Sequence, residues 1–189
     1  MKVIQLHQEE KKLIQLAVEN NRQAQQQIYT KFSSKMLSVC RQYIKDMQHA
    51  EDVMITGFMK VFTNLKSFEH KGSFEGWIRR IMIYECIDFL RVKKNNFNHQ
   101  DIEEVTLSEK ESVYEMEDFS VDDIQSLIDN LPDGYKMVFN LYAIEGYKHQ
   151  EIAEMLKITE GTSKSQLSNA RKLLQLQFTE LKNKRNGTK

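Results

Sequence analysis

Apolar residues recur every three or four positions along most of this chain, which is the spacing that places them on one face of a helix. The pattern predicts a first group of helices at about residues 9–19, 22–45, 49–65 and 74–94. A second group is predicted at about residues 121–130, 133–144, 149–156 and 160–182. One Pro and seven Gly among 189 residues leave few helix breakers. We therefore expect an all-α fold with two helical domains.

The charged residues are distributed unevenly, although the net charge of the whole chain is zero. Residues 1–100 carry 16 basic and 10 acidic side chains, and residues 124–189 carry ten basic and seven acidic ones. Residues 101–123 between them carry one Lys and ten acids. This acidic stretch predicts a linker between two basic domains, and a solvated helix on one larger domain is the alternative. The basic domains are compatible with nucleic-acid binding.

Several classes of protein are disfavoured by what the sequence lacks. Cys40 and Cys86 have no CxxC partner and the five histidines are scattered, so we expect no metal site, no cofactor and two buried reduced thiols. No apolar run or signal peptide predicts membrane insertion or export, so a cytoplasmic protein is expected. No Gly-rich phosphate loop, HExxH or nucleophile elbow occurs, which argues against an enzyme.

The segment 147–174 predicts a helix-turn-helix. Its first helix buries Ile152, Ala153 and Leu156, and a three-residue turn at 157–159 offers Thr159 as the N-cap of the second helix. The second helix has a core face made of Ser163, Leu167, Ala170 and Leu174. An ordinary helical hairpin is the alternative interpretation.

The opposite face of that second helix is polar, partly cationic and predicted to be free of carboxylates, as suits a reader of the DNA major groove. Its members are Lys164, Ser165, Ser168, Asn169 and Lys172.

The segment 49–65 carries two stripes at helical spacing. One is apolar and predicted to face the core; it comprises Met54, Phe58, Val61, Phe62 and Leu65. The other comprises Asp52, Ile55, Thr56 and Met59. An outward stripe that contains Ile and Met indicates a protein contact, because such a stripe is costly on an isolated surface. Burial of both stripes between neighbouring helices is the alternative.

The segment 65–94 interleaves aromatic and cationic residues along one helical side. This side comprises Trp77, Arg80, Tyr84, Asp88 and Arg91. Aromatic rings can stack on unpaired bases while cations neutralise phosphate, so the pattern is compatible with binding of single-stranded DNA. For Trp77 alone, a core anchor is the favoured interpretation.

The helix-turn-helix segment resembles region four of the extracytoplasmic-function (ECF) sigma factors, through Ile152-Ala153, Glu160-Gly161-Thr162, Lys164-Ser165 and Ala170-Arg171. The resemblance implies contact with the minus-thirty-five element of a promoter. Together with the polar face it assigns that contact to Thr162, Lys164, Ser165, Gln166, Ser168, Asn169, Arg171 and Lys172. Ser163 stands where the family usually has Val, and Gln166 and Asn169 stand where it has Arg.

The first domain resembles sigma region two, through Ala50-Glu51-Asp52, Ser67-Phe68, Gly72-Ser73-Phe74 and Trp77. The resemblance implies that the stripe of Asp52, Ile55, Thr56 and Met59 docks on the clamp of the largest polymerase subunit. It implies contact with the minus-ten element by Phe68, Lys71, Ser73, Phe74, Trp77, Arg80, Tyr84 and Arg91. Tyr84 replaces a family Asn, so the identity of the captured base stays open.

The two resemblances together imply one function. An ECF-type sigma factor binds core RNA polymerase, directs it to promoters and assists promoter melting, without catalysis by this chain. The implied partners are core RNA polymerase, promoter DNA and an anti-sigma factor. The alternative is a helix-turn-helix transcription regulator that binds DNA independently of polymerase.

Overall fold

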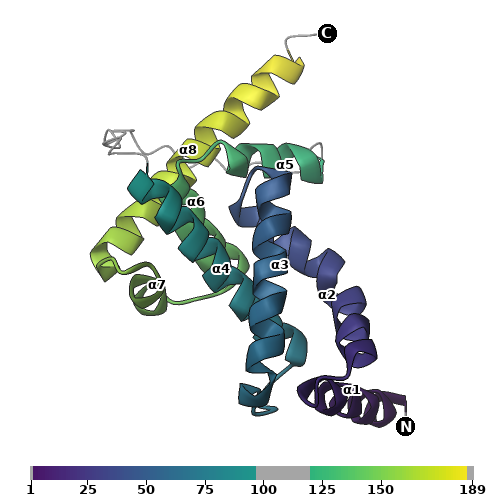
Figure 1. Cartoon of the computed structure of the whole chain (residues 1–189). Helices are drawn as coiled ribbons and strands as arrows, with labels where there is room; N and C mark the ends of the chain where they lie inside the picture. The colour runs from purple at the N-terminus through teal and green to yellow at the C-terminus, as the bar shows by residue number, and fades with distance from the viewer. Residues whose placement is uncertain (1, 97–119, 187–189) are drawn as a thin grey trace. The chain divides into compact units, whose positions relative to one another are not determined.

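The computed structural model describes residues 2–96 and 120–186, and within these ranges every regular element is a helix (Figure 1). The expected all-α fold is therefore confirmed. The chain divides into two compact units, Met1–Val92 (unit 1) and Lys93–Lys189 (unit 2). Among the helices of these described ranges, none has an apolar stretch long enough to span a lipid bilayer.

The described part of unit 1 contains three complete α-helices, one turn of 3₁₀ helix and most of a fourth α-helix, whose last residues pass the unit boundary at Val92. They are α1 (Lys2–Val18), α2 (Arg22–Tyr43), α3 (Met47–Asn64), η1 (Leu65–Ser67) and α4 (Phe74–Asn96). Three of these helices start at side-chain caps, which satisfy backbone N–H groups that lack a partner within the helix. The Ser73 Oγ atom caps α4, because it accepts a hydrogen bond from the Gly76 N–H at 3.0 Å. The Asn21 Oδ1 atom accepts a hydrogen bond from the Ala24 N–H at 3.0 Å, and Asp46 Oδ1 accepts one from the His49 N–H at 2.9 Å.

The core of unit 1 is built from the apolar faces of its helices, and α2 packs along α3. At Gly57, α3 passes close to the side chain of Met82 on α4. A Cβ atom at this position would fall only 2.4 Å from the Met82 sulfur. Cys40 and Cys86 are both free thiols and fully buried in this core, as expected. A hydrogen bond between the two thiols, together with burial, raises the pKa of Cys86 far above its usual range.

Between residues 120 and 186, unit 2 forms four α-helices and a π-helical segment. They are α5 (Val121–Asp129), α6 (Asp133–Phe139), the π-helix η2 (Asn140–Ile144), α7 (His149–Leu156) and α8 (Glu160–Asn186). Ser120 and Asp123 form a capping box at the start of α5, and the hydrogen bonds from Ser120 lower the pKa of Asp123. Residues 121–123, predicted as the end of the acidic linker, therefore belong to α5.

The core of unit 2 gathers Leu131, Tyr135 and Ala170, with Phe139, Leu173 and Leu174 packed against them. Lys136 and Asp129 form an enclosed ion pair in this unit: Lys136 Nζ lies 3.8 Å from Asp129 Oδ1, and both side chains are 4% exposed. Asp129 also accepts a hydrogen bond from Gln125 Nε2 at 3.3 Å. This hydrogen bond, in addition to the ion pair, helps to offset the free-energy cost of removing the Asp129 carboxylate from water.

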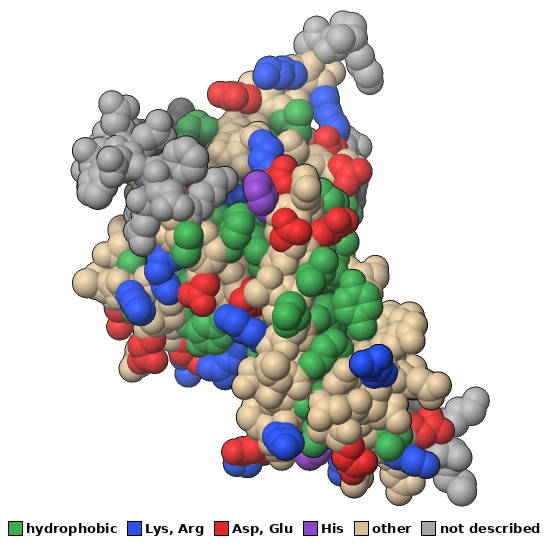
Figure 2. All heavy atoms as spheres, in the orientation of Figure 1, with side chains coloured by type: hydrophobic (Ala, Val, Ile, Leu, Met, Phe, Trp, Pro, Cys, Tyr) green, Lys and Arg blue, Asp and Glu red, His purple; other side chains and the backbone are tan. Residues whose placement is uncertain are grey.

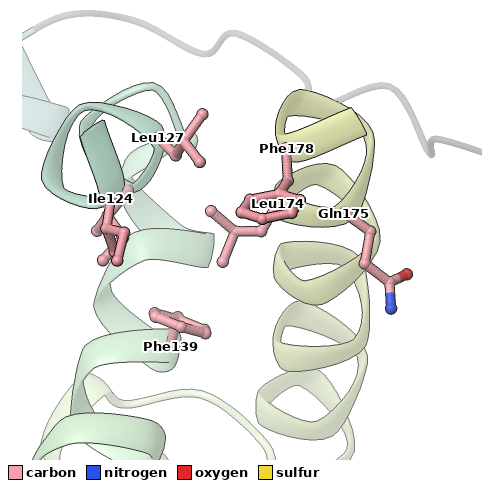
Figure 3. Close-up of a pocket in the computed structure, with 7 residues that line it drawn as sticks. Ile124, Leu127, Phe139, Leu174, Gln175 and Phe178 are labelled. Atoms are coloured by element: carbon pink, nitrogen blue, oxygen red, sulfur yellow. The ribbon is translucent and has the colours of Figure 1, made fainter. Parts of the chain in front are cut away.

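An apolar pocket of about 350 Å³ lies among α5, α6 and α8 (Figure 3). Ile124 and Leu127 line it from α5, Phe139 from α6, and Leu174 and Phe178 from α8. Leu174 and Phe178 continue the helical spacing of Leu167 and Ala170, so the pocket lies on the core-facing side of α8.

Candidate nucleic-acid interface and docking surface

Helices α7 and α8 form the predicted helix-turn-helix. Helix α7 has the predicted bounds, and it ends because Lys157 adopts a left-handed backbone conformation with φ of 56°. Thr159 caps α8, since its Oγ1 atom accepts a hydrogen bond from the Thr162 N–H at 3.0 Å. Both the turn and the cap are therefore confirmed, and they fix where the exposed face of α8 begins.

The core face of α8 is also confirmed. Ser163, Leu167 and Ala170 are buried and Leu174 is half-buried. Ser163 is a polar residue without exposed surface, and its hydroxyl pairs with His149 Nδ1 at 2.9 Å. This hydrogen bond explains how a Ser is accommodated at a position where the resemblance predicted Val, because a buried hydroxyl requires a partner.

The predicted DNA-contacting residues of α8 differ in exposure. Lys164, Ser165, Ser168 and Arg171 are exposed, and Thr162, Gln166, Asn169 and Lys172 are half-buried. Asn169 Nδ2 donates a hydrogen bond to the Tyr135 hydroxyl at 3.3 Å. Asn169 would therefore give up or share this bond in order to contact a base edge.

Lys164 is paired in the free chain. Its Nζ atom lies 2.6 Å from Glu160 Oε1, one helical turn earlier. A hydrogen bond from Lys164, followed by the charge of Lys164, lowers the pKa of Glu160, so this carboxylate is ionised at neutral pH. A carboxylate thus borders the face that the sequence predicted to be free of carboxylates.

The second stripe on α3 faces outward, as predicted. All four of its residues are exposed, with Ile55 at 49% and Met59 at 66%, whereas Met54 and Phe58 on the other side are buried. The alternative, in which both stripes are buried, is wrong for the isolated chain. Figure 2 shows hydrophobic side chains gathered over the part of this face where α3 runs. The role of the stripe in polymerase docking stays a prediction.

The residues predicted to contact the minus-ten element divide into a buried and an exposed group. Phe68 and Phe74 are buried at 8% and 2% exposure, and their ring centroids are 5.1 Å apart. Trp77 stacks on Phe74 at 5.8 Å and is half-buried. The predicted contacts of Phe68 and Phe74 with bases are therefore not available in this structure, because both rings fill the core beneath the loop. Trp77 belongs to the same aromatic cluster, which agrees with its favoured interpretation as an anchor.

The remaining residues of this group are accessible. Lys71, Ser73, Arg80 and Tyr84 are exposed and Arg91 is half-buried. The Arg80 guanidinium carbon lies 5.9 Å from the centroid of the Tyr84 ring, and Arg91 Nη1 lies 2.8 Å from Asp88 Oδ1. Helix α4 therefore presents a cation beside an aromatic ring on its exposed side, as the spacing predicted. Residues 101–119 of the predicted acidic linker lie outside the described residues.

Comparison with known families assigns both units. Residues 28–96 match the family model described as Sigma-70 region 2, and residues 121–174 match the one described as Sigma-70, region 4. These matches cover α2 to α4 and α5 to the middle of α8, and they occur in the order that the sequence predicted.

Similar proteins agree with the family matches. The ECF RNA polymerase sigma factor SigW of Bacillus subtilis is 29% identical, over 90% of this chain and 97% of that protein. The RNA polymerase sigma factor SigV of the same organism is 28% identical, over 72% of this chain and 80% of its own length. A crystal structure of the sigma factor RpoE with the anti-sigma factor NepR from Bartonella quintana has a TM-score of 0.54 at 19% identity. The matched part covers 82% of this chain and 96% of the RpoE chain, and this similarity is one of fold.

Proposed function

This chain belongs to the sigma-70 family, as an ECF-type RNA polymerase sigma factor, and from that premise we propose how it acts. It binds core RNA polymerase through unit 1, directs the enzyme to promoters through both units, and assists promoter melting. The observation that carries this proposal is the presence of both matched regions in one chain, each with an exposed surface of suitable chemistry.

Polymerase docking is assigned to the exposed stripe of Asp52, Ile55, Thr56 and Met59 on α3. The exposure of Ile55 and Met59 supports this assignment, because desolvated apolar side chains dominate the central part of protein interfaces. The partner surface is the clamp of the largest subunit of core RNA polymerase.

Recognition of the minus-thirty-five element is assigned to the exposed side of α8. Lys164, Ser165 and Ser168 lie in its first turns, where a recognition helix reaches base edges. Arg171 and Lys172 lie further along and supply phosphate contacts. Thr162, Gln166 and Asn169 complete the set as half-buried members that rearrange on binding.

Recognition of the minus-ten element is assigned to the loop before α4 and to the exposed side of that helix. Lys71 and Ser73 in the loop, with Arg80, Tyr84 and Arg91 on α4, offer cations and one accessible ring to a single DNA strand. Phe68, Phe74 and Trp77 support the loop from below rather than stack on bases.

The remaining partners follow from the same premise. We propose that the chain works in the cytoplasm, that an anti-sigma factor holds it inactive, and that it has no catalytic activity of its own. We propose residues 1–100 as region two, residues 101–120 as the linker and residues 121–189 as region four, since α5 and the region 4 match both begin at Val121.

The decisive experiment is reconstitution with core RNA polymerase. The full chain should co-purify with the core enzyme and should allow it to start transcription at promoters that core enzyme alone does not use. An independent transcription regulator, the competing function, would bind a duplex site tightly without polymerase. Tight site-specific binding by the free chain, together with no binding to core enzyme, would overturn the proposal.

A further inference from the structure

Arg171 is the most available cation on the exposed face of α8. The other two cations of this face are Lys164, which pairs with Glu160, and Lys172, which is half-buried. Arg171 is exposed, and it forms no ion pair with any residue whose side chain the structure describes. Its guanidinium carbon lies 5.7 Å from the centroid of the Tyr142 ring, within the range of a cation–π contact.

Tyr142 itself is held in a fixed orientation. It lies in the π-helix η2, a form of helix that occurs frequently at functional sites, and it is 37% exposed. Its ring stacks on the His149 ring, with centroids 4.6 Å apart and 23° between the planes. His149 Nδ1 in turn pairs with the buried Ser163 hydroxyl at 2.9 Å. Ser163 and Arg171 are both on α8. The contacts therefore form a closed series, from Ser163 on α8 to His149 on α7, then to Tyr142 in η2 and back to Arg171 on α8.

We propose that Tyr142 is a positioning residue for DNA binding, which holds the Arg171 guanidinium so that its N–H groups meet a backbone phosphate. This inference rests on the proposed function and adds a residue outside the recognition helix to it. An unsupported Arg side chain samples many rotamers, and a cation–π contact with a ring restricts them while the guanidinium N–H donors stay available for phosphate. Arg171 is eleven residues beyond Glu160, so it lies past the first turns that reach bases and is placed for phosphate.

The test measures binding of the full chain to a labelled random-sequence DNA duplex at several salt concentrations. Arg171→Ala should reduce the salt dependence of the binding constant by about 0.9 in log–log slope, the value of one lost phosphate contact. Tyr142→Leu should weaken binding about two- to fivefold, because the cation–π contact is lost. Tyr142→Phe is the matched control and should bind as the unmodified chain does, since the ring and its stacking remain.

The double variant separates positioning from other roles. In the Arg171→Ala background, Tyr142→Leu should cause no further loss of affinity, because the group that it positions is gone. An equal loss in both backgrounds would overturn the proposal, since it would mean that Tyr142 contacts DNA itself or only maintains the fold. Arg171→Ala with unchanged affinity and salt slope would overturn it as well. Neither result would affect recruitment of core polymerase, which tests the proposed function separately.

Discussion

Replacing Ile55 by Lys tests polymerase docking at one position of α3. Ile55 is 49% exposed, so about half of its surface is still in water and available for burial by a partner. Burying a whole Ile side chain contributes roughly 1.5–3 kcal/mol, so the remaining half contributes about 0.7–1.5 kcal/mol to docking. Lys loses this contribution, and its ammonium group must either be desolvated or extend out of the interface.

We therefore expect Ile55→Lys to weaken binding to core RNA polymerase by at least about tenfold, which corresponds to roughly 1.4 kcal/mol. Ile55→Ala should weaken it by about three- to tenfold, because only apolar contact is lost. The assay is a fluorescence anisotropy titration of the labelled full chain with purified core enzyme. Circular dichroism of each variant should show unchanged helix content, since the substituted side chain points to solvent.

Asn64→Lys provides the matched control. Asn64 is exposed on the same helix and lies nine residues beyond Ile55, which at 3.6 residues per turn places it on the opposite side. The same charge is added there, so a general electrostatic effect would weaken both variants alike. The reasoning is refuted when Asn64→Lys weakens binding as much as Ile55→Lys, or when Ile55→Lys lowers helicity and leaves the binding constant unchanged.

Three further predictions concern the recognition helix and the core. Glu160→Gln should raise the affinity of the full chain for duplex DNA modestly, because it releases Lys164 for phosphate. Since the pKa of Glu160 is lowered, the difference in affinity between the variant and the unmodified chain should stay constant across the neutral pH range. A fluorescence titration that finds no gain in affinity would contradict this prediction. Asn169→Ala should reduce the free energy of binding by roughly 1–3 kcal/mol at a subset of promoter positions, if the Asn169 amide reads adenine. Selection of binding sites by the reconstituted holoenzyme checks this prediction. An unchanged preferred sequence would remove Asn169 from the base contacts. Cys40 and Cys86 should resist a thiol reagent in the native protein and react once denaturant is added, because burial and the raised pKa of Cys86 suppress the reactive thiolate. Rapid labelling of the native protein in a colorimetric assay would contradict this prediction.

The elements that the sequence predicted well are those governed by local chemistry. Helix α7 and the Thr159 cap depend on residues within a few positions of one another, so apolar spacing and capping preferences were sufficient. The outward direction of Ile55 was predicted from helical periodicity together with the resemblance to sigma region two, because periodicity alone also allowed burial of both stripes. By contrast, α1 begins at Lys2, earlier than the predicted residue 9, and the π-helix at 140–144 was predicted as ordinary helix. A one-residue change in helical hydrogen bonding does not alter the apolar spacing enough to be recognised.

The features that the sequence did not predict depend on contacts between distant residues. Phe74 is buried partly because Phe32 of α2 packs against it, with ring centroids 5.8 Å apart. The pairing of His149 with Ser163 joins residues from two helices, and no local pattern indicates it. An aromatic residue in a loop can equally stack on a base or fill a core, and only its tertiary neighbours decide which occurs.

The enclosed pair of Lys136 and Asp129 has a consequence for how this sequence can change over evolutionary time. Removing one partner of such a pair costs roughly 3–5 kcal/mol, a large share of the 5–15 kcal/mol that typically keeps a domain folded. Joint replacement by apolar residues of similar volume is tolerated far better. Evolutionary loss of this ion pair by single substitutions therefore passes through an intermediate sequence that has lost one partner and is destabilised. The two positions should consequently covary, with Lys and Asp retained together or lost together among related sequences.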